Sequence, residues 1–199
     1  MSSFHKLTIK NIERLTDKSI SISFDVPESI KNAYSFKAGQ YITLKTNIDG
    51  NEVRRDYSLC VSPKSGELKV AIKEVTDGTF SAYANKMLKV GDSLEVASPK
   101  GRFVFEPNDN KTKNIATFAA GSGITPILSI IKCALEEEVY SKVILVYGNK
   151  TTEDTMFLKE LLELQHQYQQ KAHFQLLNLQ HRFHLQFPAI HPQLVIAYI

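Results

Sequence analysis

Cysteine, long apolar runs and a strong charge of one sign are all scarce in this sequence, and each scarcity excludes a class of protein. The two cysteines, Cys60 and Cys133, lie far apart and without metal-site spacing, which argues against a disulfide scaffold and indicates a reducing compartment. No stretch approaches the roughly 20 apolar residues that cross a bilayer, and the N-terminus lacks the apolar segment of a signal peptide. The net charge of +3 is too small to indicate nucleic-acid binding. We therefore expect a cytoplasmic protein with neither a nucleic-acid nor a membrane partner.

The first half of the chain has the alternating pattern of antiparallel strands. Residues 19–26 (SISISFDV) place Ile20, Ile22, Phe24 and Val26 on one face. Similar short stretches, separated by turn residues such as Asp49-Gly50, follow at residues 41–46, 67–73, 93–97 and 102–105. Strands of this length and spacing predict a small antiparallel barrel over residues 1–107.

One helix is expected to interrupt this barrel at residues 79–88. Its spacing predicts that Phe80, Ala84, Met87 and Leu88 are buried on one side.

The pattern changes after a polar linker at residues 107–113. Residues 114–120 and 142–148 are continuous apolar runs, which are typical of buried parallel strands. Helices are expected at 126–138 and 151–169, and a third strand at 173–177. Strand and helix in alternation predict a parallel α/β domain over residues 114–199.

The C-terminal tail has an unusual composition. From Ala172 to Ile199 the only Lys, Arg, Asp or Glu is Arg182. The same segment holds four of the six histidines: His173, His181, His184 and His191. Their spacing matches no common metal site, so no metal is expected. We interpret residues 178–199 as atypical of the domain before them.

A glycine-rich turn, AAGSGITP (119–126), follows an apolar strand and opens a helix. Gly121 and Gly123 permit a tight turn, and Pro126 suits the first turn of a helix. The free N–H groups and the dipole at a helix start favour a diphosphate. A plain strand-to-helix turn that needs glycine for its geometry is the alternative.

Two further stretches in the barrel half have the same chemistry. RDYSLC (55–60) combines an arginine that can bind phosphate, a tyrosine that can stack on a ring, and a serine hydroxyl. DGTFS (77–81) leads into a helix start that suits a second anion. The alternatives are an edge strand with solvated charges for the first stretch, and simple helix capping by Asp77 or Thr79 for the second.

Four motifs together resemble the ferredoxin–NADP⁺ reductase family, and within it the reductase components of phenylacetyl-CoA oxygenase-type systems. RDYS resembles the family's RxYS signature, GTFS its GxxS pyrophosphate motif, GSGITP its nicotinamide-nucleotide loop, and YGNK (147–150) the YGNR segment. The resemblance extends over residues 4–177. It implies a six-stranded antiparallel FAD-binding barrel followed by an incomplete, Rossmann-like parallel α/β domain that binds NAD(P)H.

The resemblance implies a cofactor-binding role for each matched residue. Arg55 would bind the FAD pyrophosphate, Tyr57 would stack on the flavin ring, and Ser58 would hydrogen-bond near its N5 edge. Ile72 and Lys73 would line FAD through their backbone, and the pyrophosphate would be held by Gly78, Thr79 and Ser81. NAD(P)H would face Gly121, Gly123, Ile124, Thr125 and Pro126, with Asn149 and Lys150 towards the adenosine. Ser58 and Thr125 would lie at the reacting atoms.

The implied activity is electron transfer from NAD(P)H through FAD to an iron–sulfur acceptor, either a ferredoxin or an oxygenase component. The family's Cys-Gly-Pro motif and the four cysteines of a ferredoxin domain are absent, so we expect a truncated or frame-shifted product. A flavin-binding module without turnover is therefore an alternative. A barrel that binds nucleic acid or protein is a third, disfavoured by the mild charge.

Overall fold

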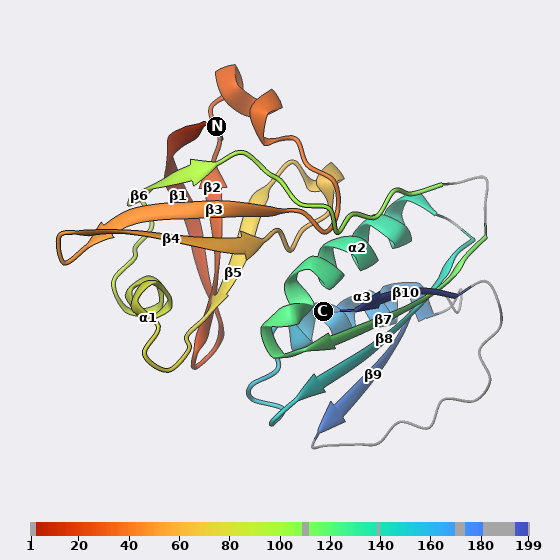
Figure 1. The fold of residues 1–199 in the computed structure, drawn as a ribbon. Coiled ribbons are helices and arrows are strands. Elements are labelled where there is room, and N and C mark those ends of the chain that lie inside the picture. The colour runs from red at the N-terminus through yellow and green to blue at the C-terminus, as the bar shows by residue number, and fades with distance from the viewer. Residues whose placement is uncertain (1–2, 109–111, 139, 170–173, 181–193, 199) are drawn as a thin grey trace.

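The computed structural model of this chain contains two sheets, and it describes residues 3–108, 112–138, 140–169, 174–180 and 194–198 (Figure 1). Strands β1–β6 form the first sheet and β7–β10 form the second. The predicted β plus α/β fold class is confirmed.

The first sheet is antiparallel, with the strand order β4-β3-β6-β1-β2-β5. Its strands are β1 (Phe4–Thr16), β2 (Ser19–Asp25), β3 (Tyr41–Ile48), β4 (Asn51–Ser58), β5 (Leu68–Lys73) and β6 (Ser93–Ala97). The sheet curls until its two edges meet, and a bridge between Leu59 and Val70 joins the end of β4 to β5. The apolar residues of the alternating pattern, such as Ile20 and Ile22, fill the interior of this barrel.

Short helices connect these strands. They are the 3₁₀ helices η1 (Glu28–Tyr34) and η2 (Pro63–Ser65), and the α-helix α1 (Thr79–Lys86). Phe80 and Ala84 of α1 are buried as predicted. The prediction for Met87 was wrong, because the helix ends at Lys86 and the Met87 side chain is 61% exposed.

The predicted strand at 102–105 was also wrong. Only an isolated bridge between Ala38 and Phe105 forms within this described segment. Phe105 leaves the barrel and packs into the second core, which explains why its segment does not continue the first sheet.

The second sheet is parallel and has the order β10-β7-β8-β9. Its strands are β7 (Asn114–Ala120), β8 (Lys142–Asn149), β9 (Phe174–Gln180) and β10 (Leu194–Tyr198). Helix α2 (Ile124–Glu137) connects β7 to β8, and α3 (Leu158–Gln169) connects β8 to β9, as the alternation predicted. Helix α3 begins later than expected because residues 151–157 form turns that end at Phe157, whose φ is +60°.

The tail of unusual composition contributes β10, which pairs in parallel with β7. Its four histidines lie outside the described residues. Within the part of the chain that the structure describes, no cluster of His, Cys, Asp and Glu is arranged to hold a metal ion. None of the described helices is long and apolar enough to span a bilayer.

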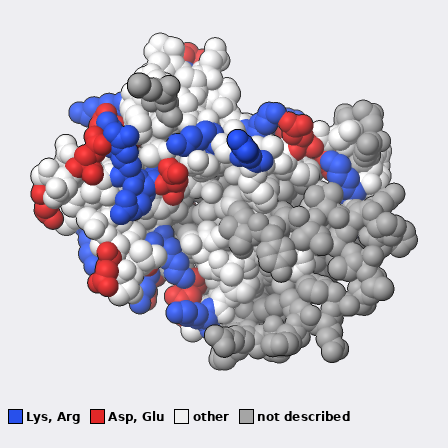
Figure 2. Space-filling view, viewed as in Figure 1, with Lys and Arg blue, Asp and Glu red and all other residues white. Residues whose placement is uncertain are grey.

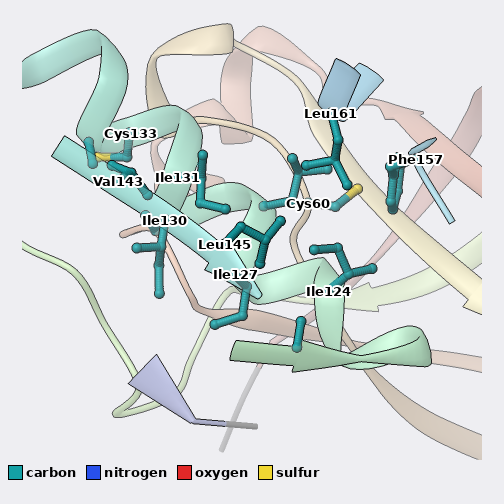
Figure 3. Packing of buried hydrophobic residues seen from close by; sticks show 14 of the residues in the cluster. Cys60, Ile124, Ile127, Ile130, Ile131, Cys133, Val143, Leu145, Phe157 and Leu161 are labelled. Carbon is teal, nitrogen blue, oxygen red and sulfur yellow. The ribbon is translucent and has the colours of Figure 1, made fainter. Parts of the chain in front are cut away.

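The barrel and the parallel sheet share one hydrophobic core, in addition to the barrel's own interior. Ala38, Cys60, Ala71 and Phe105 from the first half of the chain pack in a single cluster with α2, α3, β7 and β8. Figure 3 shows Cys60 close to Leu161 of α3 within this cluster. Both cysteines are free, as expected for a chain without a disulfide scaffold, and both are buried. Helix α2 lies between the barrel and the parallel sheet, so the relative position of the two sheets is fixed by packing (Figure 1).

Charged side chains of both signs are mixed on the surface. On the face drawn in Figure 2, Lys and Arg lie next to Asp and Glu over the barrel. This face therefore presents no large field of one sign, in agreement with the small net charge.

Candidate functional site

Three motifs that are far apart in the sequence line one cavity of about 480 Å³ between the barrel and the parallel sheet. This volume lies within the range of roughly 300–1,000 Å³ that is usual for small-molecule sites. Among the predicted residues, the lining includes Arg55, Tyr57 and Ser58 of β4, Lys73 of β5, Gly78 and Ser81 at the start of α1, and Gly123, Thr125 and Pro126 at the start of α2. We call this the first cavity.

The end of β4 supplies one wall of the first cavity. The Tyr57 ring packs against Phe80 of α1, with 5.7 Å between ring centroids and a tilt of 38°. Burial raises the pKa of Tyr57 to about 12, so its hydroxyl stays protonated at neutral pH. Ser58 is held in register by its pairing with Tyr41 of β3. This wall thus offers the partly buried ring of Tyr57 next to the hydroxyl of Ser58.

Arg55 and its neighbour Arg54 lie in different surroundings. The Arg54 guanidinium pairs with Glu52 at 2.6 Å and lies over the Phe4 ring, 5.4 Å from its centroid. Arg55 is exposed, and its Nη1 donates to the backbone oxygen of Arg54 at 2.7 Å. Arg55 makes no ion pair with any carboxylate among the described residues, which leaves its other donors available to an anion.

The start of α1 forms a second wall of the first cavity. The N-cap residue is Gly78, so the alternative of a side-chain cap from Asp77 or Thr79 is wrong. The Ser81 hydroxyl donates to the Gly78 oxygen and accepts from the Val75 N–H, both at 3.2 Å. A Cβ at position 78 would come within 2.5 Å of Val75 Cγ2 and would also collide with the Ser81 hydroxyl. Glycine is therefore required here for close packing, and the first N–H groups of the helix remain uncapped by a side chain.

The glycine-rich turn forms the third wall. Strand β7 ends at Ala120, the 3₁₀ turn Gly121–Gly123 follows, and α2 begins at Ile124 without a side-chain cap. Gly121 has a φ of +52° and open space around it, so glycine serves the backbone conformation there. The Thr125 hydroxyl donates to the Ser122 oxygen at 3.1 Å.

Tyr147 holds this turn from the neighbouring strand. Its hydroxyl donates to the Gly121 oxygen at 2.9 Å, and its ring is fully buried. Tyr147 belongs to the YGNK motif, but the motif predicts no separate role for this residue. The contact depends on which residues of β7 and β8 lie side by side. The sequence pattern predicts that the two strands are parallel, but it does not predict this register.

A second cavity, of about 960 Å³, lies next to the same turn. It is lined by Gly121, Asn149 and Lys150, and also by Lys18 from the β1–β2 turn. Lys73 borders both cavities. The oxygen and nitrogen of the Asn149 side-chain amide are buried and make no well-formed hydrogen bond among the described residues. The amide lies next to the Tyr147 hydroxyl, which donates instead to the Gly121 oxygen. An unpaired buried amide that lies at a cavity is suited to a polar ligand group.

The remaining predicted residues lie close to these cavities but do not line them. Ile72 and Ile124 are fully buried in the barrel core and the shared core, respectively. Thr79 lines a neighbouring hollow together with Lys18 and Val75. Val75 was not predicted, although it borders all three spaces and is 59% exposed. Its signal in the sequence is weak, because a single valine before a turn is common.

Two protein-family models match the chain. The model for the oxidoreductase FAD-binding domain matches residues 6–105, and the model for the oxidoreductase NAD-binding domain matches residues 118–183. The first match covers the barrel and the β4 and α1 motifs. The second begins in β7 and covers the glycine-rich turn and YGNK.

Two curated proteins are similar to this chain over most of its length. The chain is 42% identical over 171 residues to a subunit of the 1,2-phenylacetyl-CoA epoxidase of Escherichia coli (strain K12), and the match covers 86% of this chain and 48% of that protein. It is 35% identical over 164 residues to the ferredoxin reductase component of 3-ketosteroid-9-alpha-monooxygenase from Rhodococcus rhodochrous, covering 81% and 46%. The chain thus spans about half the length of these relatives.

The fold also matches a ferredoxin NADP⁺ reductase from Neisseria gonorrhoeae, solved with bound FAD and NADP. The TM-score is 0.72 at 24% identity, over 98% of this chain and 73% of that one. At this level of identity the likeness concerns the fold.

Proposed function

This chain belongs to the family of oxidoreductases with an FAD-binding domain, and from that premise we propose that it is the electron-input component of an oxygenase-type system. It is an FAD- and NAD-binding enzyme related to reductase components of such systems. The proposal adds the route of the electrons, from NAD(P)H through FAD to an iron–sulfur partner. It also assigns FAD binding to residues 1–107 and nucleotide binding to residues 114–199.

The observation that carries this proposal is the first cavity, where an arginine, an aromatic ring, a hydroxyl and two helix starts converge. This set of groups suits a ligand that has both a diphosphate and a flat heterocycle. The residues present therefore fit FAD.

Each wall of the first cavity has a proposed part in holding FAD. Arg55 and the backbone N–H groups of Thr79 and Ser81 would bind the diphosphate. The N–H of Gly78 donates to the Val75 oxygen at 3.0 Å, so Gly78 would contribute by shaping the start of the helix. The Ser81 hydroxyl bonds to its own loop, so its contribution would be to shape the loop. Tyr57, held against Phe80, would support one face of the ring, and the Ser58 hydroxyl would hydrogen-bond at the N5 edge.

The second cavity is the proposed site of NAD(P)H. The Asn149 amide is buried at this cavity without a well-formed hydrogen bond among the described residues, and it would bind a polar group of the nucleotide. Lys150 would neutralise phosphate charge nearby as a point charge, and this leaves the preference between NADH and NADPH open. Thr125 lies at the boundary of the first cavity and would contact the nicotinamide next to the flavin.

FAD supplies the chemistry when bound, because it can accept a hydride from a nicotinamide and release the electrons singly. The protein's task is to orient the two rings and to exclude water from between them. Tyr147 supports this task by fixing the Gly121 carbonyl, and with it the turn that faces the nucleotide. Ser58 and Thr125 are the two residues that we propose at the reacting atoms.

The test begins with the colour of the purified protein. We expect a yellow protein with one FAD per chain whose flavin absorbance is bleached by NADH or NADPH in an anaerobic stopped-flow experiment. Added plant-type two-iron ferredoxin should then restore the absorbance. A folded protein that stays colourless after incubation with excess FAD would refute the flavin site.

The alternative is a flavin-binding module without turnover. The NAD-binding family model matches residues 118–183, but the match does not report turnover, so an experiment must decide between the two functions. Yellow protein that neither NADH nor NADPH can bleach would establish this alternative and refute the proposed electron route. Localisation in the cytoplasm remains part of the proposal and can be tested by fractionation of cells that express the chain.

A further inference from the structure

The chain segment that directly follows the flavin-side strand is attached to α2 by a row of polar contacts. β4 ends at Ser58, and the next residues, Leu59 to Ser62, are all buried. This segment runs along α2, between the barrel and the parallel sheet (Figure 1). Because it is attached directly to Ser58, any shift of the segment would move the flavin-side wall of the first cavity.

Two consecutive backbone carbonyls of this segment accept hydrogen bonds from α2. The Ser129 hydroxyl donates to the Val61 oxygen at 2.7 Å, and the Lys132 ammonium donates to the Cys60 oxygen at 3.4 Å. Ser129 is fully buried, so this hydrogen bond is shielded from water. Donors at positions i and i+3 of a helix lie on one face, which allows α2 to bind both carbonyls at once.

The row continues towards the C-terminal end of α2. The Ser62 hydroxyl donates to Glu136, and the Lys64 ammonium pairs with Glu137 at 3.0 Å. Lys132 also pairs with Glu160 of α3 at 2.5 Å, so the same lysine joins the segment to both helices. Apolar packing of Cys60 against the shared core supports these contacts (Figure 3).

The same helix carries the nucleotide-side residues at its start. Thr125 lies in the first turn of α2, and Ser129 lies one turn later, about 5.4 Å along the axis. A short, buried path therefore joins Ser58 through the Val61 carbonyl and Ser129 to Thr125. Both ends of this path line the first cavity.

We propose that Ser129 is a positioning residue, which sets the distance between the flavin-side strand and the nicotinamide-side turn by holding the Val61 carbonyl on α2. It contacts neither FAD nor NAD(P)H. Its effect would be on the approach of the two rings, and to that extent the proposal rests on the proposed function. The proposed diphosphate contacts, Arg55 and the start of α1, do not include Ser129, so affinity for FAD should change far less than the rate of hydride transfer, although Tyr57 and Ser58 lie on the strand that shifts.

The test compares Ser129→Ala with Ile130→Val, which truncates a buried side chain at the adjacent position of α2 without touching the Val61 carbonyl. We expect Ser129→Ala to bind FAD within twofold of the unmodified chain, whereas hydride transfer in single turnover slows by about 10- to 100-fold. The visible circular dichroism of bound FAD and the long-wavelength absorbance on mixing with NADPH should change in Ser129→Ala alone. Ile130→Val should lower the melting temperature and leave the rate of hydride transfer within twofold.

Equal rates in Ser129→Ala and the unmodified chain, or equal slowing in both variants, would overturn the proposal. If neither nucleotide reduces the unmodified protein, the proposed function fails, and amide hydrogen exchange then decides about Ser129 independently. Faster exchange at residues 57–62 in Ser129→Ala than in Ile130→Val supports the positioning role, and the same exchange in both variants overturns it.

Discussion

Replacement of Arg55 by alanine is the most direct test of the first cavity. Arg55 is exposed and has no carboxylate partner among the described residues, so its loss should change the free energy of unfolding of the FAD-free protein by less than about 0.5 kcal/mol. The FAD complex would lose a hydrogen bond between a guanidinium and a phosphate, which contributes about 1.5–3 kcal/mol. Since 1.4 kcal/mol corresponds to a factor of ten, the dissociation constant of FAD should rise by about 10- to 150-fold.

The assay is a titration of FAD-free protein with FAD, followed by the quenching of flavin fluorescence. Arg54→Ala is the matched control, because it removes the same side chain from the adjacent position of β4, where the guanidinium pairs with Glu52 and lies over Phe4. Its dissociation constant should stay within threefold of the unmodified protein. The weakening in Arg55→Ala should also diminish at high salt, since the lost contact is between charges. Equal affinities for Arg54→Ala and Arg55→Ala would refute the placement of the diphosphate.

Three further predictions concern other parts of the site. Gly78→Ala should displace the loop at Ser81, destabilise the protein by about 1–3 kcal/mol in urea unfolding, and weaken FAD binding. An unchanged urea midpoint would contradict the close packing of Gly78 against Val75 and Ser81. Lys150→Ala should leave FAD content unchanged and weaken NADP⁺ binding by about tenfold in calorimetry, and a loss of flavin would contradict its place in the second cavity. Burial raises the pKa values of Cys60 and Tyr57 to about 12, so both groups ionise at lower pH in the unfolded chain than in the folded one. The free energy of unfolding should therefore fall from about pH 9 to pH 12. A urea midpoint that stays constant from about pH 8.5 to 11 would contradict this prediction.

The sequence pattern was most informative where local physics decides the structure. Strict alternation in residues 19–26 predicted a barrel strand, and β2 has that position. The apolar runs at 114–120 and 142–148 predicted parallel strands, because a strand covered on both faces needs no polar side. The glycine-rich turn between strand and helix was predicted for the same local reason.

What the pattern missed depends on tertiary contacts. The start of α3 was misplaced because residues 151–157 form turns, and Phe157, which is buried in the shared core, has a positive φ. Phe105 was assigned to a strand, although it packs between the two sheets. The hydrogen bonds from Tyr147 to Gly121 and from Ser129 to Val61 join residues 26 and 68 positions apart, and no local periodicity reports such pairs.

The core that both halves share has a consequence for engineering new reductases from this chain. Ala38, Cys60, Ala71 and Phe105 belong to the barrel half by sequence, but their side chains fill space against α2 and α3. A nucleotide-binding domain transplanted from another reductase would have to pack against these four side chains, whose positions the barrel fixes. Functional chimeras should therefore require that the four positions and the facing side of α2 are exchanged together, whereas surface loops can be exchanged freely.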